Sequence, residues 1–115
     1  MHIKAPEYHI PVLGPEVSNH LITDRNGIYV DATLGGGGHA ETILSELSDQ
    51  GKLIGIDRDP EAITKASQRL ARFENQVIFQ QAPFWHLPDI LATQGISQIA
   101  GILFDLGLSS HQIDT

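Results

Sequence analysis

Four consecutive glycines, Gly35 to Gly38, stand between a strand-like run and a helical pattern in the stretch YVDATLGGGGHAETIL. Glycine loses more conformational freedom on folding than any other residue, so such a run is costly unless the backbone must turn tightly or approach a ligand. In a strand-glycine-helix unit the glycines permit both, and the free N–H groups at the start of the helix attract anionic groups. The run predicts either a cradle for a small molecule or an ordinary tight turn.

The rest of the chain extends this unit into an alternating pattern. Strand-like runs rich in β-formers are GIYVDATL, KLIGIDRD, QVIFQQAP and IAGILFDLGL. Helical apolar stripes separate them: Ala40, Ile43, Leu44 and Leu47, then Ile63, Ala66, Leu70 and Phe73, then a shorter helix in WHLPDILATQG. Asp59 is the expected N-cap of the second helix, with Pro60 at its first position. A short helix is also expected over 14–21. The pattern predicts a doubly wound α/β fold of the Rossmann-like type, with about four parallel strands.

Composition limits the classes of function. The 115 residues are one domain at most, and 41% apolar with 18% charged residues is typical of a globular protein. A net charge of −7 argues against a large phosphate-binding surface. The lack of cysteine excludes disulfides and thiolate metal sites, and we expect no metal site. No apolar stretch near the N-terminus is long enough for a signal peptide or a membrane span, which predicts a soluble, cytoplasmic chain.

The last strand-like run, IAGILFDLGL, raises a separate question, because sheets of this type usually continue with more strands. We expect this strand to be an uncovered edge of the sheet. A long apolar edge invites pairing with another chain, so a dimer through the exposed edge is one predicted form.

Polar and aromatic residues at the strand ends define a candidate ligand site. Asp57 ends the second strand, where an acid can accept both hydroxyls of an adenosine ribose, although a capping aspartate gives the same pattern. Phe84 follows the third strand and can offer an apolar face to an adenine, whereas Trp85 is expected in the core. Asp105 ends the fourth strand and is expected to point into the crevice where open α/β sheets hold ligands.

Two cofactor classes fit this site. Gly35, Gly37 and Ala40 satisfy the G-x-G-x-x-G/A pattern of nicotinamide enzymes, and Asp57 serves either cofactor. Asp31, just before the glycines, favours S-adenosylmethionine, because a carboxylate can receive a cationic amino group and would repel a pyrophosphate.

The segments HIPVLGPEV, YVDATLGGGGHAETIL, GIDRDPEAI and GILFDLGLSSHQID occur in this order, and with them the chain closely resembles the RsmH (MraW) family. These are bacterial 16S ribosomal RNA cytosine-N4 methyltransferases, so the resemblance implies a class I methyltransferase fold, S-adenosylmethionine as cofactor and RNA as substrate. It assigns the cofactor pocket to Gly37, Gly38 and His39 at the methionine end, Asp57 on the ribose, Phe84 beside the adenosine, and Asp105 and Gln112 lining the same pocket.

Family members continue past the last aspartate with a motif resembling RGFSF, an inserted helical domain and further strands. We therefore expect residues 1–115 to form the N-terminal, cofactor-binding part of a methyltransferase domain, inactive alone and lacking most RNA contacts. Asp105 is the candidate to accept N–H bonds of the target amine, which would help localise its lone pair. A nicotinamide-binding module and a non-enzymatic remnant are the alternatives.

Overall fold

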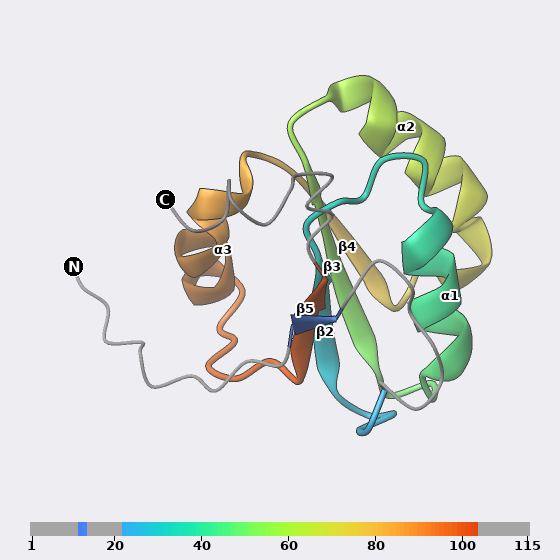
Figure 1. The fold of residues 1–115 in the computed structure, drawn as a ribbon, viewed down its shortest axis with the longest axis vertical. Helices are drawn as coiled ribbons and strands as arrows, with labels where there is room; N and C mark the ends of the chain where they lie inside the picture. The colour runs from blue at the N-terminus through green and yellow to red at the C-terminus, as the bar shows by residue number, and fades with distance from the viewer. Residues whose placement is uncertain (1–11, 14–21, 104–115) are drawn as a thin grey trace, which may run out of the picture.

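The computed structural model describes residues 12–13 and 22–103, which form one parallel sheet with helices on both faces (Figure 1). The sheet has five strands in the order β1-β5-β2-β3-β4, and every pairing is parallel. The strands are β1 (Val12–Leu13), β2 (Ile28–Asp31), β3 (Lys52–Asp57), β4 (Val77–Gln81) and β5 (Gly101–Leu103). The predicted α/β fold of the Rossmann-like type is confirmed.

Within residues 22–103, three α-helices connect the strands. They are α1 (Gly38–Glu46), α2 (Pro60–Arg69) and α3 (Leu87–Thr93), with the short 3₁₀ helices η3 (Ala71–Phe73) and η4 (Phe84–His86). In Figure 1, α1 and α2 lie on one face of the sheet and α3 on the other. The helix expected over 14–21 lies outside the described residues.

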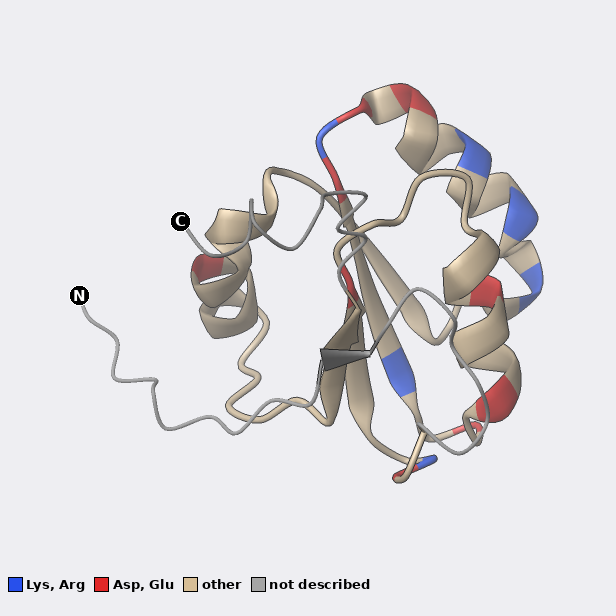
Figure 2. Ribbon diagram, viewed as in Figure 1, with Lys and Arg blue, Asp and Glu red and all other residues tan. Residues whose placement is uncertain are grey.

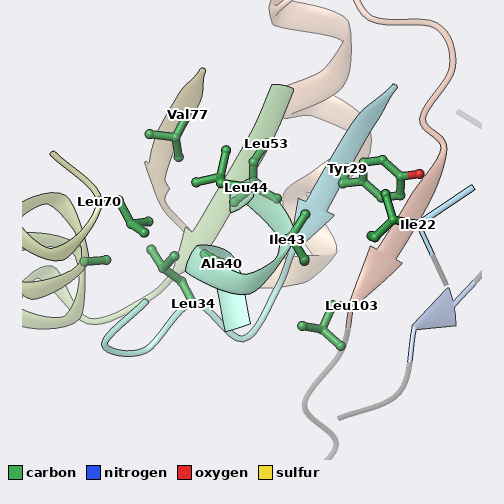
Figure 3. Close-up of a cluster of buried hydrophobic side chains, with 11 residues drawn as sticks. Ile22, Tyr29, Leu34, Ala40, Ile43, Leu44, Leu53, Leu70, Val77 and Leu103 are labelled. Carbon is green, nitrogen blue, oxygen red and sulfur yellow. The ribbon is translucent and has the colours of Figure 1, made fainter. Parts of the chain in front are cut away.

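Alternate residues of each strand supply two separate cores. Tyr29 and Leu53 point to the α1–α2 face, where Ile43 and Leu44 of α1 pack against them (Figure 3). Val30 and Ile54, their neighbours along the strands, belong instead to the cluster beneath α3. Both faces of the central strands are therefore buried, which is why the sequence reads as continuous apolar runs.

The ends of α2 and α3 follow from local sequence. Asp59 caps α2 as predicted, because its Oδ1 accepts the Glu61 N–H at 2.9 Å, and Pro60 occupies the first helical position, where its missing N–H costs nothing. Gly95 follows α3 with a φ of +72°, a conformation that glycine adopts without strain.

The predicted uncovered edge is wrong. β5, the fourth predicted strand, is internal: it pairs with β2 on one side and with β1 on the other, Val12 lying opposite Ile102. The two residues of β1 were too few to recognise as a strand in the sequence. Because β5 is paired on both sides, it offers no edge for a dimer. Among the described residues, no helix is both long and apolar enough to cross a membrane.

Candidate nucleotide-binding site

The glycine run forms a tight loop between β2 and α1. Gly37 has a φ of +92°, its N–H donates to the Leu34 carbonyl at 2.7 Å, and its own carbonyl accepts the Glu41 N–H. A Cβ at Gly37 would lie 3.4 Å from the Cα of Ala66, so α2 packs directly on the loop. At Gly36 a Cβ would meet nothing within 4 Å. The positive φ thus favours glycine at Gly37, and Gly36 faces open space.

Asp57 fastens the loop to the end of β3. Its Oδ2 accepts the Gly35 N–H at 2.9 Å, and its Oδ1 accepts the Asp59 N–H at 2.9 Å. One carboxylate therefore holds both the start of the glycine loop and the turn into α2. Each carboxylate oxygen has two lone pairs, so both oxygens retain the capacity to accept another donor.

Asp57 and Phe84 line the same hollow. Its volume is about 130 Å³, and its walls are formed by Ala32, Ile56, Asp57, Arg58, Ala82 and Phe84. These residues come from the carboxyl ends of β2, β3 and β4, where open parallel sheets bind ligands. The hollow combines apolar walls with one acidic and one basic side chain, Asp57 and Arg58, a mixture typical of small-molecule sites.

The strand order reverses beside the glycine loop. β2 has β3 on one side and β5 on the other, so the crevice outside the ends of β2 and β5 is the switch point of the sheet. Asp31 ends β2 opposite Leu103 of β5; it is completely buried, and its Oδ1 accepts the Thr33 N–H at 2.8 Å. Its carboxylate therefore shapes the turn that leads into the glycine loop.

A three-residue ion cluster holds α1 against α2. Glu41, in the first turn of α1, receives Arg69 Nε on one carboxylate oxygen and Arg72 Nη1 on the other, both at 3.0 Å. Figure 2 shows the basic bands along α2 and its extension beside the acidic bands of α1. The hydrogen bond from Arg69, and then that from Arg72, lower the pKa of Glu41 below its usual value of 4.5. Gly38 lies beside this cluster, since a Cβ there would be 3.7 Å from Arg69 Nη1.

We expect the free energy of unfolding to depend less on pH in Glu41→Gln than in wild type. A carboxyl whose pKa is lowered by folding stabilises the fold above its ordinary pKa, and that contribution disappears as the pH falls through the lowered value. Wild type should therefore exceed Glu41→Gln in free energy of unfolding at neutral pH, with the gap closing in acid. Urea denaturation across this range measures it, with Glu61→Gln as a charge-matched control. A gap independent of pH would contradict the assignment.

The structure brings together some predicted site residues and not others. The loop glycines, Asp57 and Phe84 gather at the carboxyl edge of the sheet, and His39 is the second residue of α1, half-buried beside the loop. Asp105 and Gln112 lie outside the described residues. The expectation that Trp85 is a core residue is wrong: it lies on η4, none of whose residues is buried, and it is 58% exposed.

Two features of the site had no signal in the sequence. Glu41 and Arg69 are 28 residues apart, and only the packing of α2 on α1 makes them partners. Arg58 lies with its guanidinium carbon 5.5 Å from the centre of the Trp85 ring, a contact that depends on where η4 sits. The acid-base-acid order of 57–59, visible where β3 leads into α2 in Figure 2, was the one available hint of charge at this rim.

A parallel sheet that reverses its strand order beside a glycine loop, with an acid at the end of the next strand, defines a Rossmann-like α/β domain. One solved structure with this fold is described as an rRNA-methylase from Clostridium thermocellum; the TM-score is 0.58 at 20% identity, over 62% of this chain and 41% of that one. That likeness concerns the fold alone. The model of the MraW methylase family matches residues 7–115, and the chain belongs to this family.

Several relatives carry the name ribosomal RNA small subunit methyltransferase H. The protein from Trichlorobacter lovleyi is 48% identical over 108 residues, which are 94% of this chain and 34% of that protein. The one from Geotalea uraniireducens is 49% identical over 94% of this chain and 35% of its own length. A third, from Clostridium botulinum strain Hall, is 48% identical over 92% and 34%. The chain spans about a third of the length of these curated relatives.

Proposed function

We infer that this chain is the S-adenosylmethionine-binding part of a methyltransferase that modifies the exocyclic N4 amine of a cytidine in 16S ribosomal RNA. The observation that carries the proposal is the position of Asp57, which holds the glycine loop at Gly35 while lining one hollow with Phe84. Membership of the MraW methylase family and the names of the relatives support the same reaction class.

The residues present fit this cofactor. Asp57 retains lone pairs for the two ribose hydroxyls, Phe84 provides an apolar wall for the adenine, and Gly36 leaves room beside the loop backbone. Gly37, Gly38 and His39 would face the methionine end at the start of α1. When bound, the cofactor supplies a methyl group on a positively charged sulfur. The carboxylate of Asp57 in the hollow, with that of Asp31 buried at the end of β2, favours such a cation over a dinucleotide with its pyrophosphate.

The protein's own part in the reaction is chiefly to position the reactants. The exocyclic amine of cytosine is a weak nucleophile because its lone pair is delocalised into the ring. Asp105, two residues beyond β5 in the sequence, is proposed to accept an N–H of that amine, and Gln112 to line the same pocket. An RNA base must also be unstacked to enter such a site, which needs surfaces that grip the neighbouring nucleotides.

Calorimetric titration of the 115-residue chain with S-adenosylmethionine and S-adenosylhomocysteine tests the proposal. We expect saturable one-to-one binding of both and none of NAD. A ligand at about 100 times its dissociation constant should also add about 2.7 kcal/mol to the free energy of unfolding, measurable as a raised Tm. A preference for NAD would overturn the assignment. A folded chain that binds neither methionine derivative would place the cofactor site in longer family members only.

A further inference from the structure

An aromatic strip on η4 is left uncovered at the rim of the proposed cofactor hollow. Phe84 is 49% exposed and Trp85 58% exposed, and no other large hydrophobic side chain is exposed in the described parts of the chain. The ring centres of Phe84 and Trp85 are 5.5 Å apart at an interplanar angle of 77°, and those of Trp85 and His86 are 6.4 Å apart at 86°. Exposed apolar area of this kind marks a binding surface more often than a lone surface residue does.

The strip contributes side chains to two hollows. Phe84 lines the hollow that contains Asp57, and His86 lines a second one of about 200 Å³ between β4 and α3. The walls of the second hollow carry amide, carboxylate, hydroxyl and imidazole groups, from Gln80, His86, Asp89, Thr93 and Gln94. Side chains of these types form hydrogen bonds with the edges of unpaired bases.

Arg58 adds a cation to the strip. Its guanidinium carbon lies 5.5 Å from the centre of the Trp85 ring, within the range of a cation–π contact, and both side chains are exposed. Aromatic rings and arginine planes together are the groups on which proteins stack unpaired bases. Gln81 and Asp89, which lie on either side of η4 in the sequence, are both exposed. This setting does not resemble the apolar core of a protein–protein interface.

We propose that Phe84, Trp85 and His86, with Arg58, form a stacking platform for an unpaired nucleotide of the RNA substrate. The platform rests on the proposed function, since an RNA ligand is expected only for a methyltransferase of this class. Asp57, which lines a hollow with Phe84, and Asp89, which lines one with His86, disfavour a continuous path for phosphates. Binding therefore depends on base stacking and on a single arginine, and it discriminates single strands from duplexes.

Trp85 is the one tryptophan in the sequence, so its fluorescence reports on the platform alone. A short mixed-sequence RNA oligonucleotide should quench the emission saturably, whereas the same RNA paired with its complement should not. Affinity should fall with salt along a logarithmic slope of about −0.7, the value for one neutralised phosphate on a single strand. Equal quenching by the duplex would overturn the proposal, as would an emission spectrum and acrylamide resistance typical of an indole already buried by the chain itself.

Variants test whether RNA binds at the platform. The affinity of each variant is measured from the anisotropy of labelled single-stranded RNA. Trp85→Ala should weaken affinity roughly tenfold, Trp85→Phe should retain most of it, and Arg58→Ala should weaken it and flatten the salt dependence. Arg25→Ala removes the same charge from the loop that precedes β2 and should change nothing. Unchanged affinity in Trp85→Ala overturns the platform. Calorimetry with S-adenosylhomocysteine on the same preparations separates this result from the proposed function: cofactor binding without RNA binding removes the platform alone.

Discussion

Gly37→Ala should destabilise the fold by about 2 kcal/mol, because a side chain at a φ of +92° places its Cβ against the neighbouring backbone. The new Cβ would make only an ordinary contact with Ala66 at 3.4 Å, so the cost comes from the backbone conformation. Gly37 is the N-cap of α1, so relief of the strain would shift the start of that helix. We therefore expect affinity for S-adenosylhomocysteine to fall by at least about tenfold, the equivalent of 1.4 kcal/mol.

Gly36→Ala is the matched control. Its backbone φ is not positive and a Cβ there meets nothing within 4 Å, so stability should stay the same or rise by a few tenths of a kcal/mol, roughly the gain from restricting the unfolded chain. Urea denaturation and calorimetry of both variants give the comparison. Equal destabilisation of the two would contradict a positive φ at Gly37 and not at Gly36.

Most of the fold was predictable because it is encoded in local patterns. Four strands and three helices appear as short apolar runs and helical stripes, and Asp59 with Pro60 defines the start of α2 without reference to any distant residue. The place of β5 within the sheet, by contrast, is not encoded in a local pattern. It depends on β1, whose two residues pair with a strand some ninety positions later. Because β1 is too short to show a strand period, the sequence did not predict it. The sequence therefore predicted that β5 is the edge of the sheet, which is wrong.

The candidate site was predictable only as far as topology determines it. The ends of neighbouring parallel strands meet at one edge, so the loop glycines and Asp57 were expected to be close. The structure shows that one oxygen of Asp57 accepts the Gly35 N–H and the other accepts the Asp59 N–H. These two hydrogen bonds depend on the path of two turns, which the spacing of residues in the sequence does not determine. The exposure of Trp85 was missed for a related reason: large aromatic residues are usually buried, and only the orientation of η4 decides otherwise.

Asp57 holds the glycine loop and is also the proposed ligand of the ribose, so its substitution should affect both stability and cofactor binding. Asp57→Ala leaves the Gly35 and Asp59 N–H groups without their acceptor and should cost roughly 2 kcal/mol of stability, mostly at the partly buried Gly35. It also removes the proposed acceptor of two ribose hydroxyls. Hydrogen bonds to a charged group are worth about 1.5–3 kcal/mol each, so affinity for S-adenosylhomocysteine should fall by about 100-fold or more.

A variant that removes a carboxylate acceptor at another turn separates the two effects. Asp24→Ala removes an equal charge and the acceptor of the Asn26 N–H, at a turn that precedes β2 and lies outside the site. Calorimetry well below the Tm of each variant should then find cofactor binding intact in Asp24→Ala and lost in Asp57→Ala, although both are less stable than wild type. If Asp57→Ala binds as tightly as wild type, its carboxylate serves only to hold the loop. The ribose hydroxyls would then have to be bound by other residues.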